Sequence, residues 1–73
     1  MDKDTMKDIR LYKKMTQEQF ADWLDVSIAT IAMIESGQRG ISDNIRGKLA
    51  HKFEVTDEFI EYRKRKDDLF FNA

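Results

Sequence analysis

Hydrophobic residues recur three or four positions apart in five stretches of the chain, with polar residues filling the positions between them. Such spacing predicts helices that each bury one face. It places helices at residues 4–14, 17–24, 28–36, 42–53 and 56–66, followed by a short C-terminal tail at 67–73. The chain has no proline and only three glycines, which favours the same interpretation because both residues destabilise helix interiors.

Residues 16–37 predict two short helices joined by a tight turn. Thr16 can cap the first helix with Gln19 as its capping-box partner, and Ser27 can cap the second. Only three residues lie between the helices, so one of them must adopt a left-handed conformation. Asp25 is the candidate, because Asp tolerates that conformation. Two helices joined by a three-residue turn form a helix-turn-helix.

The residues of this stretch also resemble a known family. The DNA-binding unit of the phage repressors Cro and CI and of their bacterial relatives, the XRE family, is similar in the type and spacing of its residues. The resemblance extends from Ile9 to about Thr56 and implies an all-α fold, a five-helix lambda-repressor-like DNA-binding domain that forms one domain over residues 1–73. The family usually has Gly at the corner where this chain has Asp25. The matching residues are Thr16, Gln17, Phe20, Ala21, Leu24, Val26, Ser27, Thr30, Ile31, Ile34, Glu35 and Gly37.

The resemblance implies how the domain contacts double-stranded operator DNA. The second helix of the motif enters the major groove and the first lies across the backbone. By resemblance, Gln17, Ser27 and Thr30 contact phosphates, and Arg39 and Arg46 make further backbone contacts. The implied function is a sequence-specific transcription regulator, repressor-like and of phage or mobile-element origin, acting in the cytoplasm on the nucleoid of a bacterial host. The full set of candidate DNA-binding residues is Gln17, Ser27, Ile28, Ala29, Thr30, Ala32, Met33, Gln38, Arg39 and Arg46.

The base-facing positions of the second motif helix are apolar, which leaves two functions open. Ile28, Ala29, Ala32 and Met33 offer no side-chain hydrogen bond to a base, although apolar groups can contact the thymine methyl and groove shape can add specificity. The alternative is a repurposed helix-turn-helix that binds a protein partner through helix 28–36, as an antirepressor-like or antitoxin-like module. Thirteen basic and fourteen acidic residues give a formal charge of −1, which favours the alternative because DNA-binding domains are usually basic.

Arg10 lies among the apolar residues of the first predicted helix, where an unpaired charge is costly. In the family that the chain resembles, a residue at this position pairs with the glutamate that ends the second motif helix. That glutamate corresponds to Glu35. We therefore expect a structural ion pair between Arg10 and Glu35.

A weak homodimer is expected, because helix-turn-helix proteins of this size usually bind two half-sites about 34 Å apart. Apart from helix 28–36, apolar surface for a dimer is available only near the C-terminal end of the chain. The candidate interface residues are Phe59, Tyr62, Leu69, Phe70 and Phe71.

Several local features lead to narrower predictions. Gly47 lies inside a predicted helix, where it costs about 1 kcal/mol relative to Ala. We interpret it as a place where the backbone closely approaches either a neighbouring group or a ligand. Asp4 or Thr5 is expected to cap the first helix, and Phe59 and Ile60 are expected to face the core.

The sequence lacks the residues that enzymatic or metal chemistry would need. It has no cysteine and one histidine, His51, with no acidic cluster beside it, and it contains no glycine-rich phosphate loop or nucleophile motif. No apolar run approaches the roughly 20 residues of a membrane span. We expect no enzyme, no cofactor, no metal site and no membrane partner.

Overall fold

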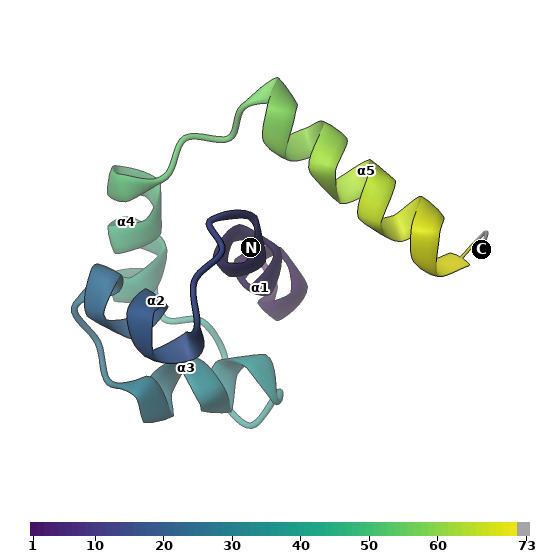
Figure 1. Ribbon diagram of the computed structural model, residues 1–73. Helices are drawn as coiled ribbons and strands as arrows, with labels where there is room; N and C mark the ends of the chain where they lie inside the picture. Colours follow the sequence, from purple (N-terminus) through teal and green to yellow (C-terminus); the bar gives the residue numbers. More distant parts are fainter. Residues whose placement is uncertain (72–73) are drawn as a thin grey trace.

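The computed structural model describes residues 1–71, and the side chains of residues 1–67. This part of the chain forms five α-helices and no strand, which confirms the predicted all-α fold. Figure 1 shows α2, α3 and α4 grouped on one side of α1, with α5 running past α1 on the other side. The helices are α1 (Lys3–Tyr12), α2 (Gln17–Leu24), α3 (Ile28–Glu35), α4 (Asp43–Lys52) and α5 (Asp57–Phe71).

Short polar side chains cap the N-terminal ends of α2, α3 and α4, and the caps of α2 and α3 are those that the sequence predicts. Thr16 Oγ1 accepts a hydrogen bond from the Gln19 backbone at 3.1 Å, and Gln19 Oε1 accepts one from the Thr16 backbone at 2.9 Å, which completes a capping box. Ser27 caps α3 and Ser42 caps α4 in the same manner. Each cap satisfies a backbone N–H group that has no partner within its helix.

Helix α1 differs from its predicted range of 4–14 at both ends. Asp2 is its cap, rather than Asp4 or Thr5, and its carboxylate accepts a hydrogen bond from the Thr5 backbone at 2.8 Å. That bond holds the pKa of Asp2 below its ordinary value. The helix ends at Tyr12, because Lys14 takes a left-handed conformation with φ of 57°.

Helix α5 is longer than the predicted range of 56–66. Thr56 caps it, accepting a hydrogen bond from the Phe59 backbone at 3.2 Å. The helix continues to Phe71, so the expected tail at 67–73 is helical over residues 67–71. No glycine or proline follows Gly47, and the sequence therefore has no residue that would stop the helix earlier.

The hydrophobic core takes side chains from all five helices. Ile31 and Ile34 are the buried residues of α3, and Phe59 is the buried residue that α5 contributes. Burying such side chains is the main favourable contribution to folding. The core residues are Met6, Ile9, Phe20, Ala21, Leu24, Ile31, Ile34, Ile45, Leu49 and Phe59.

An aromatic cluster joins α1 to the start of α5. The ring centroid of Tyr12 lies 5.2 Å from those of both Phe59 and Tyr62, and that of Phe53 lies 5.1 Å from Phe59. Phe59 is only 2% exposed, so the expectation that it forms a dimer interface is wrong. The expectation that Ile60 faces the core is also wrong, because its side chain is exposed.

Of the remaining candidates for the dimer interface, the structure describes the side chain of one. Tyr62 is half-buried against the same aromatic cluster. The side chains of Leu69, Phe70 and Phe71 lie outside the part of the chain whose side chains are described.

A charged contact holds the middle of α5 to α1. Asp8 is buried, its Oδ2 accepts a hydrogen bond from Arg63 Nε at 2.9 Å, and its Oδ1 accepts one from Lys66 Nζ. Arg63 and Lys66 are three residues apart and therefore share one face of the helix.

Gly47 does not mark a close approach to another part of the chain. A Cβ atom added to it would meet no other protein atom within 4 Å, so the interpretation that it approaches a neighbouring group is wrong.

Candidate DNA-binding surface

The corner between α2 and α3 depends on a left-handed residue. Asp25 has φ of 57° and ψ of 49°, as predicted, and its N–H donates to the Asp22 carbonyl at 3.2 Å. The Val26 N–H donates to the Ala21 carbonyl at 3.0 Å. These bonds close the end of α2, and only three residues separate it from α3.

Two lysines of α4 strengthen this corner, which the sequence analysis did not predict. Lys48 Nζ donates to the Asp25 carbonyl at 3.0 Å, and Lys52 Nζ donates to the Trp23 carbonyl. Cations stabilise the C-terminal end of a helix, where carbonyl groups lack partners. The spacing of four between the lysines places both on one face of α4, which is the only signal of their role in the sequence.

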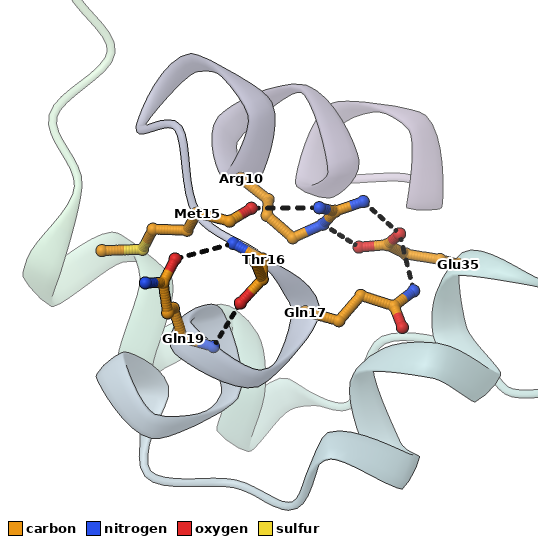
Figure 2. Close-up of polar contacts among 6 residues, drawn as sticks. All are labelled: Arg10, Met15, Thr16, Gln17, Gln19 and Glu35. Atoms are coloured by element: carbon orange, nitrogen blue, oxygen red, sulfur yellow. Dashed lines mark hydrogen bonds and ion pairs between the residues drawn. The ribbon is translucent and has the colours of Figure 1, made fainter.

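A partly buried network of hydrogen bonds ties α1, α2 and α3 together, as Figure 2 shows. Arg10 Nε donates to Glu35 Oε2 at 2.7 Å and Arg10 Nη2 donates to Glu35 Oε1 at 2.9 Å, so the expected pair is formed by two parallel hydrogen bonds. Arg10 Nη1 donates to the Met15 carbonyl at 3.0 Å, and Gln17 Nε2 donates to Glu35 Oε1 at 3.2 Å. The Arg10 and Glu35 side chains are 12% and 6% exposed. The network fixes the end of α3 relative to the start of α2.

The environment of Glu35 contains opposing influences on its pKa. Burial raises the pKa, whereas the hydrogen bonds from Arg10 and Gln17 and the nearby charge of Arg10 lower it. The net result is a pKa below the ordinary value. The carboxylate is therefore ionised at neutral pH, as the paired guanidinium requires.

Gln17 is both a member of this network and the first residue of α2. One of its two amide hydrogens is donated to Glu35, and the other is available to an outside acceptor. The first backbone N–H groups of a helix also have no partner within it and favour a bound anion. Glu35 thus positions Gln17 at the end of α2 that the sequence analysis assigned to a phosphate.

The exposed face of α3 consists of Ile28, Ala29, Ala32 and Met33. Ile28 is 49% exposed and Met33 is 36% exposed, while Ala29 is exposed and Ala32 is half-buried. Ser36 is the residue directly after α3, and its hydroxyl group donates to the Met33 carbonyl at 3.1 Å. The surface that α3 presents is therefore largely apolar.

The hydroxyl groups of Ser27 and Thr30 lie at the start of α3. Their oxygens are 2.8 Å apart and share a hydrogen bond, and Ser27 Oγ also accepts from the Thr30 backbone. Because one hydroxyl hydrogen lies between the two oxygens, the other can reach a phosphate oxygen. The pair offers one donor rather than two.

The remaining candidate residues follow α3. Gln38 and Arg39 are exposed in the loop, and Arg46 is exposed on α4, 3.7 Å from Asp43. Arg39 and Arg46 line one open hollow together with Lys3. The hollow brings basic groups from three parts of the chain to one edge of α3.

The charge of this region opposes DNA binding. Residues 16–46 contain two basic residues, Arg39 and Arg46. The acidic residues of the same range are Glu18, Asp22, Asp25, Glu35 and Asp43. Arg10 neutralises Glu35, but the remaining excess of negative charge repels phosphates and limits affinity.

Other kinds of site have no support in the described part of the chain. None of its helices is long and apolar enough to cross a membrane. Among the same residues, no three His, Cys, Asp or Glu side chains are placed to hold a metal ion.

The fold and the corner geometry define a helix-turn-helix domain. The helix-turn-helix family model matches residues 6–60, about three quarters of the chain. The chain belongs to this family, in its Cro/CI or XRE type, whose members are DNA-binding regulators. Searches of curated proteins and of solved structures returned no significant match.

Proposed function

We propose that this protein is a repressor-like transcription regulator that places α3 in the major groove of operator DNA. The observation that carries the proposal is the exposed face of α3, which protrudes from a corner fixed by the Arg10–Glu35–Gln17 network. A recognition helix must be both exposed and held at a fixed angle. The family membership of the chain supports the same reading.

In this proposal, repression comes from occupying a DNA site. The resemblance of residues 16–37 to the phage repressors Cro and CI supports a phage or mobile element as the origin, with action in the cytoplasm and nucleoid of a bacterial host. The phosphate contacts of the proposal come from Gln17, one hydroxyl of the Ser27–Thr30 pair, Gln38, Arg39 and Arg46.

A gel shift on the DNA that flanks its own gene, at two salt concentrations, tests this function. The logarithm of the association constant should fall with the logarithm of salt by about 0.9 per neutralised phosphate. Arg39→Ala and Arg46→Ala should each weaken binding to all sequences and reduce the slope by about one. Arg65→Ala is the matched control, because Arg65 is an exposed arginine on α5, the helix on the other side of α1. Equal effects of all three substitutions would contradict the proposed contacts.

We also propose that two protomers bind as a weak dimer, with half-sites about 34 Å apart. Tyr62 and the region of Leu69, Phe70 and Phe71 stay the candidates for the interface, while buried Phe59 does not. Sedimentation at high protein concentration should show self-association that truncation after Lys66 weakens. An unchanged profile would remove residues 67–73 from the interface. Lys66 is retained in the truncated chain, so its contact with Asp8 is kept.

A second candidate function is favoured by the apolar face of α3 and the acidic excess of residues 16–46. In this function α3 binds a protein, as in an antirepressor-like or antitoxin-like module. A large exposed apolar surface is typical of protein interfaces, and the absence of basic charge is no obstacle there.

Selection from random duplexes separates the two functions. DNA recognition predicts an enriched motif, whereas a protein-binding module predicts none. In the second case Met33→Lys should abolish a protein complex without changing the midpoint of urea unfolding, because Met33 is exposed. An enriched motif whose binding is lost on Met33→Lys would reject the protein-binding function.

A further inference from the structure

We propose that α3 recognises its DNA site through thymine C5-methyl groups rather than through hydrogen bonds to base edges. The proposal rests on the proposed DNA-binding function and names the base chemistry that this surface selects. It assigns Ile28 and Met33 as the residues that determine specificity.

The helix geometry groups the residues concerned. Successive residues of an α-helix are rotated by about 100°, so Ile28, Ala29, Ala32 and Met33 occupy one arc of roughly 140°. Ile31 and Ile34 lie on the opposite side and are fully buried in the core. The orientation of α3 is therefore fixed, and the same four side chains face outward in every copy.

No polar side chain on or beside this arc is available for bidentate contact with a base. Ser36 lies near the centre of the arc, but its hydroxyl donates to the Met33 carbonyl. Glu35 is held by Arg10 and Gln17. Thr30 lies at the border and shares its hydroxyl bond with Ser27. Recognition of guanine or adenine in the major groove normally uses Arg, Lys, Asn or Gln, and none of these is present on α3.

Thymine matches such a surface because its C5-methyl is the apolar group that an unmodified base presents in the major groove. Ile28 is the first residue of α3 and Met33 lies on the next turn, so their side chains can cover methyl groups on neighbouring base pairs. Each covered methyl is removed from water, whereas cytosine at the same place carries only hydrogen at C5 and offers no methyl to cover.

Two reciprocal changes in the DNA test the proposal on the site returned by random-duplex selection. Replacing the critical thymine with uracil removes only the methyl and should weaken binding about four-fold per covered methyl. Replacing the same base pair with cytosine and guanine should also weaken binding, because cytosine has no methyl at C5. Methylating that cytosine at C5 should then recover about four-fold, because it restores the methyl at the same position of the groove.

Protein variants locate the contact. Ile28→Ala or Met33→Ala should reduce the ratio of affinities for the thymine and uracil sites towards one. Ile60→Ala is the matched control, because Ile60 is an exposed isoleucine on α5, and it should keep the wild-type ratio. Urea unfolding of each variant shows that the fold is retained, since all three side chains are exposed.

The outcomes are distinguishable. Selective binding to DNA that is insensitive to both uracil and 5-methylcytosine would overturn methyl recognition and leave the proposed function standing. A sensitivity that survives in both α3 variants would overturn the assignment of Ile28 and Met33. Selection that returns no motif would overturn the proposed function and this inference together.

Discussion

Two carboxylates connect α1 to the two regions beside it. Glu35 lies on α3 and ties the helix-turn-helix region (α2 and α3) to α1, whereas Asp8 lies on α1 and holds α5 of the C-terminal region (α4 and α5). Glu35 receives two parallel hydrogen bonds from Arg10, and both side chains are nearly inaccessible to water. Asp8 is equally buried, but its partners Arg63 and Lys66 are 37% and 28% exposed. If the Asp8 carboxylate is lost, water can solvate Arg63 and Lys66. If the Glu35 carboxylate is lost, water has little access to Arg10 and cannot solvate it to the same extent.

The comparison implies that the Glu35 contact supports the whole fold and the Asp8 contact supports one helix. An unpaired buried charge is expensive, whereas a charge near the surface is not. The aromatic contacts of Phe59 hold the start of α5 independently of Asp8. The two carboxylates should therefore differ both in the size and in the extent of their effects.

The largest effect is expected from Glu35→Gln. It leaves the Arg10 guanidinium buried without a carboxylate and should lower the free energy of unfolding by about 3 kcal/mol. Urea unfolding followed by helical circular dichroism measures the change. Glu18→Gln, at an exposed carboxylate of α2, should cost less than about 1 kcal/mol. If Glu35→Gln unfolds at the wild-type midpoint, the pair is not structural.

The same contact predicts a dependence on pH. The pKa of Glu35 in the folded protein lies below its ordinary value of 4.5. The stabilisation is therefore complete above pH 4.5 and is lost as pH falls through the lower folded pKa, because the unfolded chain takes up the proton first. The difference in unfolding free energy between wild type and Glu35→Gln should narrow between pH 5 and pH 3. A constant difference over that range would show that ionisation of Glu35 is irrelevant to stability.

Asp8→Asn should have a smaller and more local effect. Loss of two charge-assisted hydrogen bonds, with both cations near water, should cost about 1–2 kcal/mol. Amide hydrogen exchange should accelerate in α5 from Arg63 onward while α2 and α3 keep their protection. Asp4→Asn, at an exposed carboxylate of α1, is the control. Equal acceleration across all five helices would contradict the assignment of Asp8 to one helix.

The two regions also differ in how far the sequence could predict them. The caps at Thr16, Ser27 and Ser42 are local signals, because each side-chain oxygen accepts a hydrogen bond from the backbone only three residues later. The turn at Asp25 is also local, because it follows from the short gap between two helices. The apolar surroundings of Arg10 indicated that it needs a partner, but Glu35 was expected as that partner only through the family resemblance.

Contacts of the C-terminal region lacked such signals. Asp8 meets Arg63 and Lys66 across 55 and 58 residues, and helical periodicity shows which face is buried without showing which helices meet. Lys48 and Lys52 were missed for the same reason. The length of α5 was underestimated because residues 67–73 were predicted to form a tail, although the sequence after residue 66 contains no glycine or proline that would stop the helix.

The two regions also differ in where they contain glycine. In the C-terminal region, Gly47 lies at a helical position whose backbone conformation does not require glycine. Gly47 lies inside α4, and an added Cβ would meet nothing within 4 Å. Gly47→Ala should therefore raise the free energy of unfolding by about 1 kcal/mol through helix propensity alone. Thermal and urea unfolding measure the gain. A loss of stability would show that Gly47 has a role that the fold does not reveal.

The helix-turn-helix region shows the opposite case, because a left-handed position there is occupied by Asp25. Glycine adopts φ of 57° without the steric cost that a side chain adds, but it also gives the unfolded chain more freedom. Asp tolerates the left-handed region better than most residues, so the steric cost that glycine relieves is modest. After subtracting the greater freedom of the unfolded chain, Asp25→Gly should raise the free energy of unfolding by about 0.5 kcal/mol.

Asp25→Asn separates backbone strain from charge, because Asn removes the negative charge and also tolerates the conformation. If backbone strain is the cause, Asp25→Gly should raise the free energy of unfolding measured in urea. Asp25→Asn should then unfold with the same free energy as wild type. Equal gains for Gly and Asn would instead assign the effect to repulsion among the acidic residues of 16–46. In that case both variants should also bind DNA more tightly at low salt, and the gain should disappear as salt is added.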